Sequence, residues 1–188
     1  PPRGFRDVLE IGRIRTPGMF NLAWSKPEPL VPRRWRLEAI ERIAADGSVV
    51  TPLDEASVRK AAATFAAERV EAVAICFINS YANAANERGA IAAVREVWPN
   101  DFVTASHEVL SEIREFERSS TAAINAYLQP VVASYIGKLE SELKTQGFPG
   151  QLHIVQSNGG IMSTATARKL PARTALSLGG PEPLLSPP

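Results

Sequence analysis

The residues best suited to chemistry gather in two short stretches of the sequence. The first, residues 107–118, reads H-E-V-L-S-E-I-R-E-F-E-R and holds a histidine, four glutamates and two arginines. The second, residues 156–160, reads Q-S-N-G-G and combines three polar side chains with two glycines. With one asparagine between them, these stretches supply the candidate residues of a substrate or nucleotide cleft: His107, Glu108, Arg114, Arg118, Asn125, Gln156, Ser157, Asn158, Gly159 and Gly160.

The charged stretch allows two interpretations. Arginine binds carboxylate or phosphate through paired hydrogen bonds, so Arg114 and Arg118 could line a site for an anionic ligand. Histidine changes its charge easily near neutral pH, so His107 could carry a proton. Alternatively the stretch is a solvated helical turn, in which a pair such as Arg114 and Glu117 contributes about 0.3 kcal/mol. The residue types leave both interpretations open, and the catalytic residues stay unknown.

The glycine stretch and Asn125 are equally open. A glycine pair that follows a strand can expose backbone N–H groups to an anion. Residues 156–160 match neither a phosphate-loop nor a dinucleotide-binding motif, however, and a simple turn explains them as well. Asn125 lies beside an apolar helical stripe, so it needs polar partners if it is buried; it either ties down a loop or contacts a ligand. The lone Cys76 excludes an internal disulfide and a thiolate metal cluster, and no metal site is expected.

Three predicted strands must position these residues. Residues 71–78 form a continuous apolar run, typical of a strand covered on both faces in a parallel sheet. A helix over 86–97 and a strand over 101–106 complete a parallel βαβ unit. A further strand over 151–155 precedes the glycine stretch. We expect all three strands to lie side by side and to deliver their polar ends to one cleft, since open α/β sheets bind ligands at that edge.

The other elements follow from turn and capping residues. Residues 35–52 predict a β-hairpin whose turn, Asp46-Gly47, takes two positive φ values. Asp54 is typical of a helix N-cap, for a helix to about Arg69. Residues 1–34, rich in proline and arginine, predict a surface connection or an arm over a site elsewhere.

A long helix follows the charged stretch and ends at Gly147, a residue suited to a left-handed cap. Pro130 should kink or restart it. After the glycine stretch we expect a helix over 163–169 and a strand over 173–178. The core face of the long helix should be its apolar stripe, made of Ile124, Leu128, Val131, Tyr135 and Leu139.

Composition limits the class of protein. The 188 residues are 45% hydrophobic and 22% charged, which suits one globular domain or two small lobes. A net charge of +1 recruits neither nucleic acid nor an acidic membrane surface. No apolar run is long enough to cross a bilayer, and the first residues lack the apolar core of a signal peptide. With a single cysteine, this favours a cytoplasmic protein.

Seven phrases in order resemble the hydantoinase A and 5-oxoprolinase family, which includes N-methylhydantoinase A subunits and acetone carboxylase β-type subunits. They cover most of the chain and lie at residues 4–13, 31–33, 80–83, 106–110, 112–118, 125–130 and 156–160. The resemblance implies an α/β protein with part of an actin-like (sugar-kinase-like) ATPase fold, containing parallel βαβ units and one β-hairpin.

The resemblance also implies a function. It predicts an ATP-dependent hydrolase that opens a hydantoin or 5-oxoproline ring, with a small cyclic amide as substrate. ATP would phosphorylate the amide oxygen, water would then attack, and Mg²⁺ would bridge the phosphates. A hydantoinase B-type subunit or domain is the expected partner.

The sequence departs from the family at both ends. The family's first phosphate loop is absent, and residues 179–188 are proline-rich and divergent. We therefore expect an internal fragment: residues 1–106 end the family's N-terminal region, and residues 107–178 begin its catalytic region. The isolated fragment should be inactive and shows no cofactor site of its own. The alternative is a non-catalytic structural or subunit-assembly module derived from that family.

Overall fold

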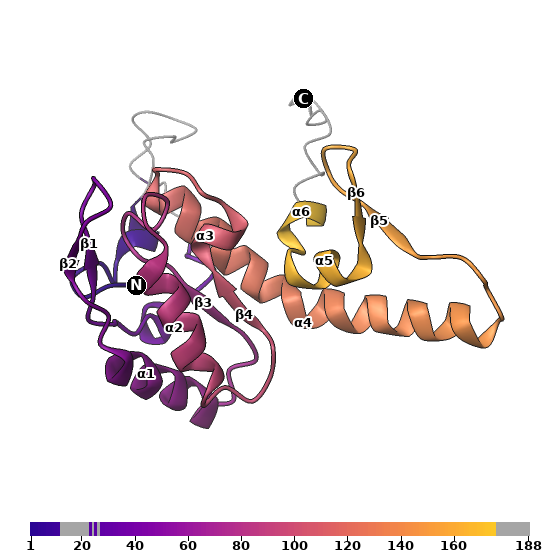
Figure 1. The fold of residues 1–188 in the computed structure, drawn as a ribbon, viewed down its shortest axis with the longest axis horizontal. Coiled ribbons are helices and arrows are strands. Elements are labelled where there is room, and N and C mark those ends of the chain that lie inside the picture. The colour runs from indigo at the N-terminus through magenta and orange to yellow at the C-terminus, as the bar shows by residue number, and fades with distance from the viewer. Residues whose placement is uncertain (12–22, 24, 26, 176–188) are drawn as a thin grey trace. The chain divides into compact units, whose positions relative to one another are not determined.

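The chain divides into two compact units, residues 1–127 and 128–188, in a computed structural model that describes residues 1–11, 23, 25 and 27–175 (Figure 1). Most of the predicted N-terminal arm between residues 12 and 26 lies outside the described residues. So do the divergent tail and residues 176–178 of the expected last strand. Each unit is considered by itself below.

The first unit is organised around a βαβ motif. Strands β3 (Val73–Ile75) and β4 (Val103–Ala105) pair in parallel, with Val73 opposite Val103, and helix α2 (Ala85–Arg95) connects them (Figure 1). This confirms the predicted unit, although each strand is shorter than its apolar run. All of β4 is buried, as expected of a parallel strand that is covered on both faces.

Helix α1 (Glu55–Ala67) packs against α2 and covers this motif. It begins as predicted, because the Asp54 carboxylate accepts hydrogen bonds from the N–H groups of Ala56 and Ser57. Val58, Ala62 and Phe65 recur along one helical face and are buried. They join apolar side chains of β3, β4 and α2 in the main core cluster of the unit, where each large side chain contributes roughly 2 kcal/mol by leaving water.

The predicted hairpin is present, with shorter strands and a different turn. Strand β1 (Arg42–Ile43) pairs antiparallel with β2 (Val49–Thr51). Only Gly47 takes a positive φ, of 86°, so the expectation of two positive φ values was wrong. The Asp46 carboxylate instead accepts the N–H and hydroxyl of Ser48, at 2.9 and 2.7 Å, which closes the turn without a left-handed aspartate.

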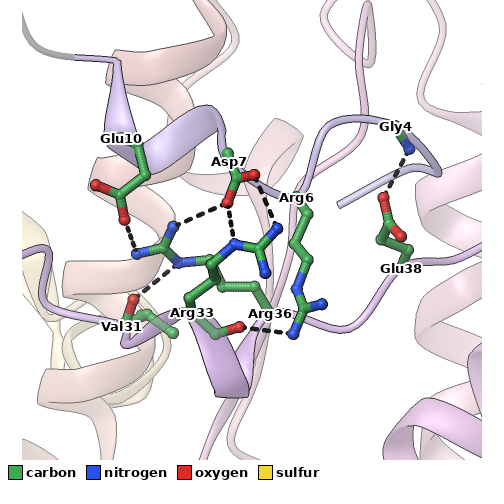
Figure 2. Close-up of polar contacts among 8 residues, drawn as sticks. All are labelled: Gly4, Arg6, Asp7, Glu10, Val31, Arg33, Arg36 and Glu38. Carbon is green, nitrogen blue, oxygen red and sulfur yellow. Dashed lines mark hydrogen bonds and ion pairs between the residues drawn. The ribbon is translucent and has the colours of Figure 1, made fainter.

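An ion-pair network ties the first described segment to residues 31–38 (Figure 2). Short 3₁₀ turns at Val8–Glu10 and Arg33–Trp35 place the charged side chains. Asp7 accepts two hydrogen bonds from the Arg33 guanidinium, at 2.8 and 3.1 Å. The buried Arg36 donates to the Glu10 carboxylate at 2.7 Å and to the backbone oxygen of Val31 at 2.9 Å. These contacts anchor the chain on either side of residues 12–26.

A short helix, α3 (Ser106–Val109), continues directly from β4, and α4 (Glu115–Thr145) follows. Helix α4 continues through Pro130 as a single element, so the chain does not restart there. It ends as predicted near Gly147, whose φ is 72°.

The core face of α4 was predicted wrongly. Val131 and Tyr135 are 67% and 64% exposed. The buried side chains lie on a different stripe: Arg118, Ala122, Asn125, Gln129 and Ile136. The prediction assumed that the large apolar residues lie on the inner face of the helix. Instead, small alanines on that face allow α4 to pack closely, and the buried polar side chains there make hydrogen bonds. The helix is therefore oriented by polar contacts as well as by apolar burial.

The second unit contains an antiparallel hairpin. Strand β5 (His153–Val155) pairs with β6 (Ile161–Ser163), and helices α5 (Thr164–Lys169) and α6 (Ala172–Ala175) follow. The helix over 163–169 is thus confirmed. Ile136 of α4, Met162 and Ala167 form a small apolar cluster beneath the hairpin.

Three expectations fail here. Residues 151–155 do not extend the β3–β4 sheet, because β5 forms a separate two-stranded sheet with β6. The described residues accordingly contain two β-hairpins instead of one. Residues 172–175 are helical, so the strand expected over 173–178 does not begin there. The glycine stretch turns the chain back on itself, which makes a local antiparallel partner available to β5 at little entropic cost.

Among the described residues, no helix is both long and apolar enough to span a bilayer.

Candidate functional site

A buried carboxylate stands at the centre of the polar groups in the first unit. Glu87 of α2 is fully buried. Its Oε1 accepts the backbone N–H of Phe77 at 2.7 Å and the hydroxyl of Ser106 at 2.6 Å. Its Oε2 accepts the backbone N–H of His107 at 2.9 Å and lies 2.6 Å from the ring Nδ1 of His107. One side chain therefore joins the ends of both parallel strands.

These hydrogen bonds keep Glu87 ionised inside the protein. Burial alone would raise its pKa, but the donors from His107, Ser106 and Phe77 outweigh burial and hold the pKa of Glu87 below its usual value. Cys76 lies nearby and behaves in the opposite way. Part of this residue is exposed, yet its thiol is desolvated, and burial together with the negative charge of Glu87 raises the pKa of Cys76 to about 12. A thiol with such a pKa is a poor nucleophile.

Arg118 fastens α4 to the same strand ends. It is almost completely buried. Its guanidinium donates to the backbone oxygen of Phe77 at 2.8 Å, to the backbone oxygen of Glu112 at 2.6 Å and to the Ser106 hydroxyl at 3.2 Å. It also lies 5.7 Å from the ring centroid of Tyr81. These contacts within the protein use the paired geometry that an anionic ligand would need.

Two further contacts complete this cluster. The Ser80 and Ser106 hydroxyls lie 3.1 Å apart, which links the loop after β3 to the start of α3. Asn125 is fully buried and donates to the Thr104 hydroxyl on β4 at 3.0 Å. This contact ties α4 to a strand, and a ligand contact by Asn125 stays a prediction. We name Glu87, Ser106, His107, Arg118 and Asn125 the strand-end network.

The loop after β3 has mainly a structural role. Asn79 and Asn83 donate from their side-chain amides to the backbone oxygens of Ile43 and Gly47, at 3.0 and 2.8 Å. The loop therefore holds the first hairpin, while Ser80 between them reaches the strand-end network.

The other predicted residues of the charged stretch lie nearer the surface. Glu108 is half-buried in α3, and Arg114 is exposed just before α4. The backbone oxygen of Arg114 accepts the N–H of Arg118, which fixes the start of the helix. His107 and Arg118 are brought together around Ser106, whereas the Arg114 side chain makes no hydrogen bond or ion pair to the described residues.

The glycine loop, residues 156–160, closes the β5–β6 hairpin. Gln156 N donates to the Gly160 oxygen, and Gly159 N donates to the Gln156 oxygen. Gly160 N donates to the Asn158 side chain, and both the N–H and the hydroxyl of Ser157 donate to the Arg173 oxygen. Four of the loop's backbone N–H groups are therefore already engaged. Those left to a ligand are the Asn158 backbone N–H and the side-chain amides of Gln156 and Asn158.

The two glycines are required for different reasons. Gly159 has a φ of 84°, a left-handed conformation that side chains disfavour. A Cβ on Gly160 would lie 3.1 Å from the Asn158 Oδ1 and 3.3 Å from the Gln156 Nε2. The bare backbone at Gly160 thus lets the two side-chain amides converge above it.

A separate cavity of about 560 Å³ lies between the end of α4 and the β5–β6 hairpin. Its lining includes Lys144, Phe148 and His153, and none of the predicted site residues belongs to it.

Sequence reasoning missed Glu87 and Ser106. Glu87 stands in a helix among polar and small residues, where a glutamate is normally solvated. Its position carried a clue, because Glu87, Ala90 and Val94 share one face by helical spacing and the latter two are buried. A glutamate on the inner face of a helix needs partners, which the strand ends supply.

The described residues contain no group of three histidine, cysteine, aspartate or glutamate side chains able to hold a metal ion. The glycine loop fits a polar or anionic group better, since it offers uncommitted amide donors beside a close-approach glycine.

Comparison with known proteins places the chain in a class. Residues 1–98 match the hydantoinase/oxoprolinase N-terminal region, and residues 118–182 match the hydantoinase/oxoprolinase family. The chain therefore belongs to the hydantoinase/oxoprolinase family, as the ordered phrases predicted.

Particular relatives agree with this assignment. The caprolactamase subunit alpha of Pseudomonas jessenii is 38% identical over 168 residues, which cover 88% of this chain and 24% of that protein. The crystal structure of the ATP-dependent caprolactamase from Pseudomonas jessenii superposes with a TM-score of 0.81 at 35% identity, covering 93% of this chain and 26% of that one. The nucleotide-free structure of an acetone carboxylase gives 0.76 at 26% identity, covering 94% and 26%.

These structures confirm the predicted fold class, a mixed α/β part of an actin-like ATPase fold. The chain spans about a quarter of the length of the curated relatives it matches.

Proposed function

We propose that this chain is a fragment of an ATP-dependent hydrolase that opens a cyclic amide ring, of the hydantoin or 5-oxoproline type. The likeness to the ATP-dependent caprolactamase structure, with a TM-score of 0.81 at 35% identity, carries the proposal. A lactam is itself a cyclic amide, and both parts of the hydantoinase/oxoprolinase family are matched in order.

In the proposed reaction ATP phosphorylates the amide oxygen, which makes the amide carbon more electrophilic, and water then attacks that carbon. Loss of the ring nitrogen leaves an acyl phosphate, which a second water hydrolyses. Mg²⁺ bound to ATP would neutralise phosphate charge during the transfer. Among the described residues we assign no metal ligand. Their part in the reaction is to bind and orient.

Within the enzyme, we propose direct ligand contacts for Arg114, Gln156 and Asn158. The Arg114 guanidinium and the side-chain amide nitrogens of Gln156 and Asn158 donate no hydrogen bond to the described residues. These donors are therefore available to a ligand. The sequence also made Arg118 and Asn125 candidates for the cleft. In the structure both side chains hold the first unit together from inside, through the contacts of the strand-end network.

A comparison of two exposed arginines distinguishes a direct ligand contact from a general effect of charge. Arg114→Ala and Asn158→Ala in the complete enzyme should each lower kcat/KM by at least about tenfold, the loss typical of one charge-assisted hydrogen bond. Arg95→Ala, on the exposed side of α2, is the matched control and should leave kcat/KM unchanged. Unchanged turnover in both test variants would remove these residues from the site.

The partner and the domain division belong to the same proposal. A B-type subunit or domain would complete the enzyme. The caprolactamase relative is a subunit alpha, which supports a multi-subunit assembly. We place the junction between the N-terminal and catalytic regions at residues 106–119, which the family matches to 1–98 and 118–182 support. An ATP-consuming reaction would operate in the cytoplasm, where ATP is supplied.

The experiment that tests the function supplies the complete enzyme with hydantoin, 5-oxoproline and caprolactam, with and without Mg-ATP, and detects ring-opened products by mass spectrometry. Ring opening that requires ATP is expected. Acetone with bicarbonate forms a further arm, because the acetone carboxylase structure is also similar. Carboxylation without any ring opening would replace the proposal.

The alternative function is a non-catalytic structural or subunit-assembly module derived from the same family. Titration of the 188-residue chain with Mg-ATP by calorimetry distinguishes the two for this part of the protein. Saturable binding would refute a purely structural module. Loss of complex formation on deleting this chain, with ATP binding elsewhere unchanged, would support one.

A further inference from the structure

The pairing of Glu87 with His107 fixes which ring nitrogen carries a proton. Glu87 accepts four hydrogen bonds through two carboxylate oxygens, two of them from backbone N–H groups. Such surroundings stabilise the ionised carboxylate. An ionised carboxylate can only accept, so the Nδ1 of His107, 2.6 Å from Oε2, must donate. In the neutral ring, the lone pair therefore resides on Nε2.

The Nε2 atom is left available. The His107 side chain is 14% exposed, and its hydrogen bonds to described residues all run through the backbone N–H and Nδ1. His107 immediately follows β4, at the carboxyl end of two parallel strands. Ligands of open α/β sheets bind outside that edge. A carboxylate that orients one histidine nitrogen while the other makes no hydrogen bond to the described residues is also an arrangement found in proton-transfer sites.

We propose that Glu87 is a positioning residue that holds His107 with Nε2 as a proton acceptor for the water that attacks the activated amide. The inference deepens the proposed function and rests on it. The Nε2 lone pair forms an N–H bond while an O–H bond of water breaks, and the electron pair of that bond forms the new bond to carbon. When the ring C–N bond breaks, its electron pair stays on nitrogen, which takes the proton from Nε2, while the new hydroxyl on carbon loses its remaining proton to solvent and becomes the carbonyl of an acyl phosphate. A second water then cleaves this acyl phosphate to the carboxylate and inorganic phosphate.

A purely structural role would predict something different. Glu87 also joins the strand ends through Phe77 and Ser106, so a structural staple would affect folding but not the chemical step. The test must therefore separate turnover from stability and from substrate affinity.

The first measurement uses nitrogen NMR of the 188-residue chain, which has only two histidines, His107 and His153. In its neutral form, His107 should show the Nδ1–H tautomer, with the lone pair on Nε2. The exposed His153, whose Nδ1 has only a long contact of 3.3 Å to the backbone oxygen of Gln151, is the internal reference and should hold its tautomer less firmly than His107. In Glu87→Gln the fixed tautomer of His107 should be lost. An Nε2–H tautomer of His107 in the wild-type chain would overturn the proposal, whatever the enzyme's activity.

The second measurement is kinetic, in the complete enzyme. His107→Gln should lower kcat at least about a hundredfold, within the range usual for general base catalysis, with KM changed less than about threefold. Glu87→Gln should lower kcat about tenfold, and the double variant should be no worse than His107→Gln alone, because the two residues act as one unit. His153→Gln is the matched control and should leave kcat unchanged.

The outcomes separate the two proposals. A folded His107→Gln enzyme that keeps kcat within about threefold of the wild type contradicts the role of His107 while the ring-opening function stands. A wild-type enzyme that opens no ring with ATP contradicts the function and, with it, the step assigned to Nε2. Thermal unfolding of each variant shows whether a lost kcat reflects a lost fold.

Discussion

The strand-end network and the glycine loop both consist of polar residues, yet they satisfy these residues in different ways. In the network the side chains bond to one another and to strand ends, and nearly all of it is buried. In the loop, most backbone N–H groups bond within the second unit, while the amide nitrogens of Gln156 and Asn158 stay uncommitted. The network is built to hold a geometry, and the loop is built to offer donors.

This difference teaches how to assign roles to polar residues that look alike in sequence. Arg118 and Arg114 are four residues apart, but one is buried with its guanidinium engaged and the other is exposed. Removing a buried polar group leaves its partners without hydrogen bonds, whereas removing an exposed one does not. Stability should therefore respond to changes in the network, and ligand affinity to changes in the loop and at Arg114.

The largest expected effect follows removal of the carboxylate at the centre of the network. Glu87→Ala should lower the free energy of unfolding by about 3–5 kcal/mol, because it leaves buried donors unpaired. Glu87→Gln, which keeps the shape, should cost about 1–3 kcal/mol. Urea unfolding of the chain measures both. Glu96→Gln at the C-cap of α2 is the control and should change little, because Glu96 is exposed and loses only a surface ion pair with Arg59. A Glu87→Ala chain as stable as the wild type would remove the network from the account.

Arg118 provides the next test. Arg118→Met keeps the aliphatic length but leaves the backbone oxygens of Phe77 and Glu112 without their donor. We expect a loss of about 2–3 kcal/mol in the free energy of unfolding. Arg95→Met, at an exposed position of α2, should cost far less. Equal effects of the two substitutions would mean that burial does not distinguish these arginines.

The pH dependence of stability sharpens the same comparison. The pKa of Glu87 lies below its usual value of 4.5 in the folded chain. Its contribution is therefore complete above pH 4.5 and is lost as the pH falls through the folded-state pKa. The difference in unfolding free energy between wild type and Glu87→Gln should shrink in that acid range. Carboxylates that do not interact with Glu87 titrate equally in both chains and cancel. A difference that stays constant down to acid pH would show that Glu87 is not held ionised.

The smallest effect belongs to the loop. Gly159→Ala places a Cβ on a residue with a φ of 84° and should cost about 1 kcal/mol. Gly137→Ala within α4 is the matched control, because its Cβ would meet only the end of the Arg168 side chain at 3.8 Å. That control should be neutral or slightly stabilising. A loop variant as stable as the control would mean that the turn relaxes without its left-handed residue.

The sequence predicted the local structure well and the long-range arrangement less well. The N-cap at Asp54, the βαβ unit and the left-handed Gly147 depend on neighbouring residues, and all three are present. The inner face of α4 depends on which surface receives the helix, and there hydrogen bonding to β4 and its flanking loops prevailed over the apolar stripe.

The prediction of the strand that pairs with β5 was wrong for a related reason. A strand pattern does not name its partner, and the turn at residues 156–160 offered β6 first. Within the strand-end network, His107 and Arg118 were singled out from their chemistry, but Glu87 was not, because its partners come near it only through the fold. The ordered family phrases, by contrast, carried information that no single residue pattern holds, and the family matches confirmed them.

The measurement that tests the central claim most directly is the stoichiometry of phosphate release and ring opening by the complete enzyme. Phosphate and ring-opened product should form in equal amounts. Without ATP no ring should open, and without the cyclic amide no phosphate should be released. Ring opening at the same rate without ATP, or ATP hydrolysis that is indifferent to a cyclic amide, would contradict an ATP-dependent ring-opening enzyme.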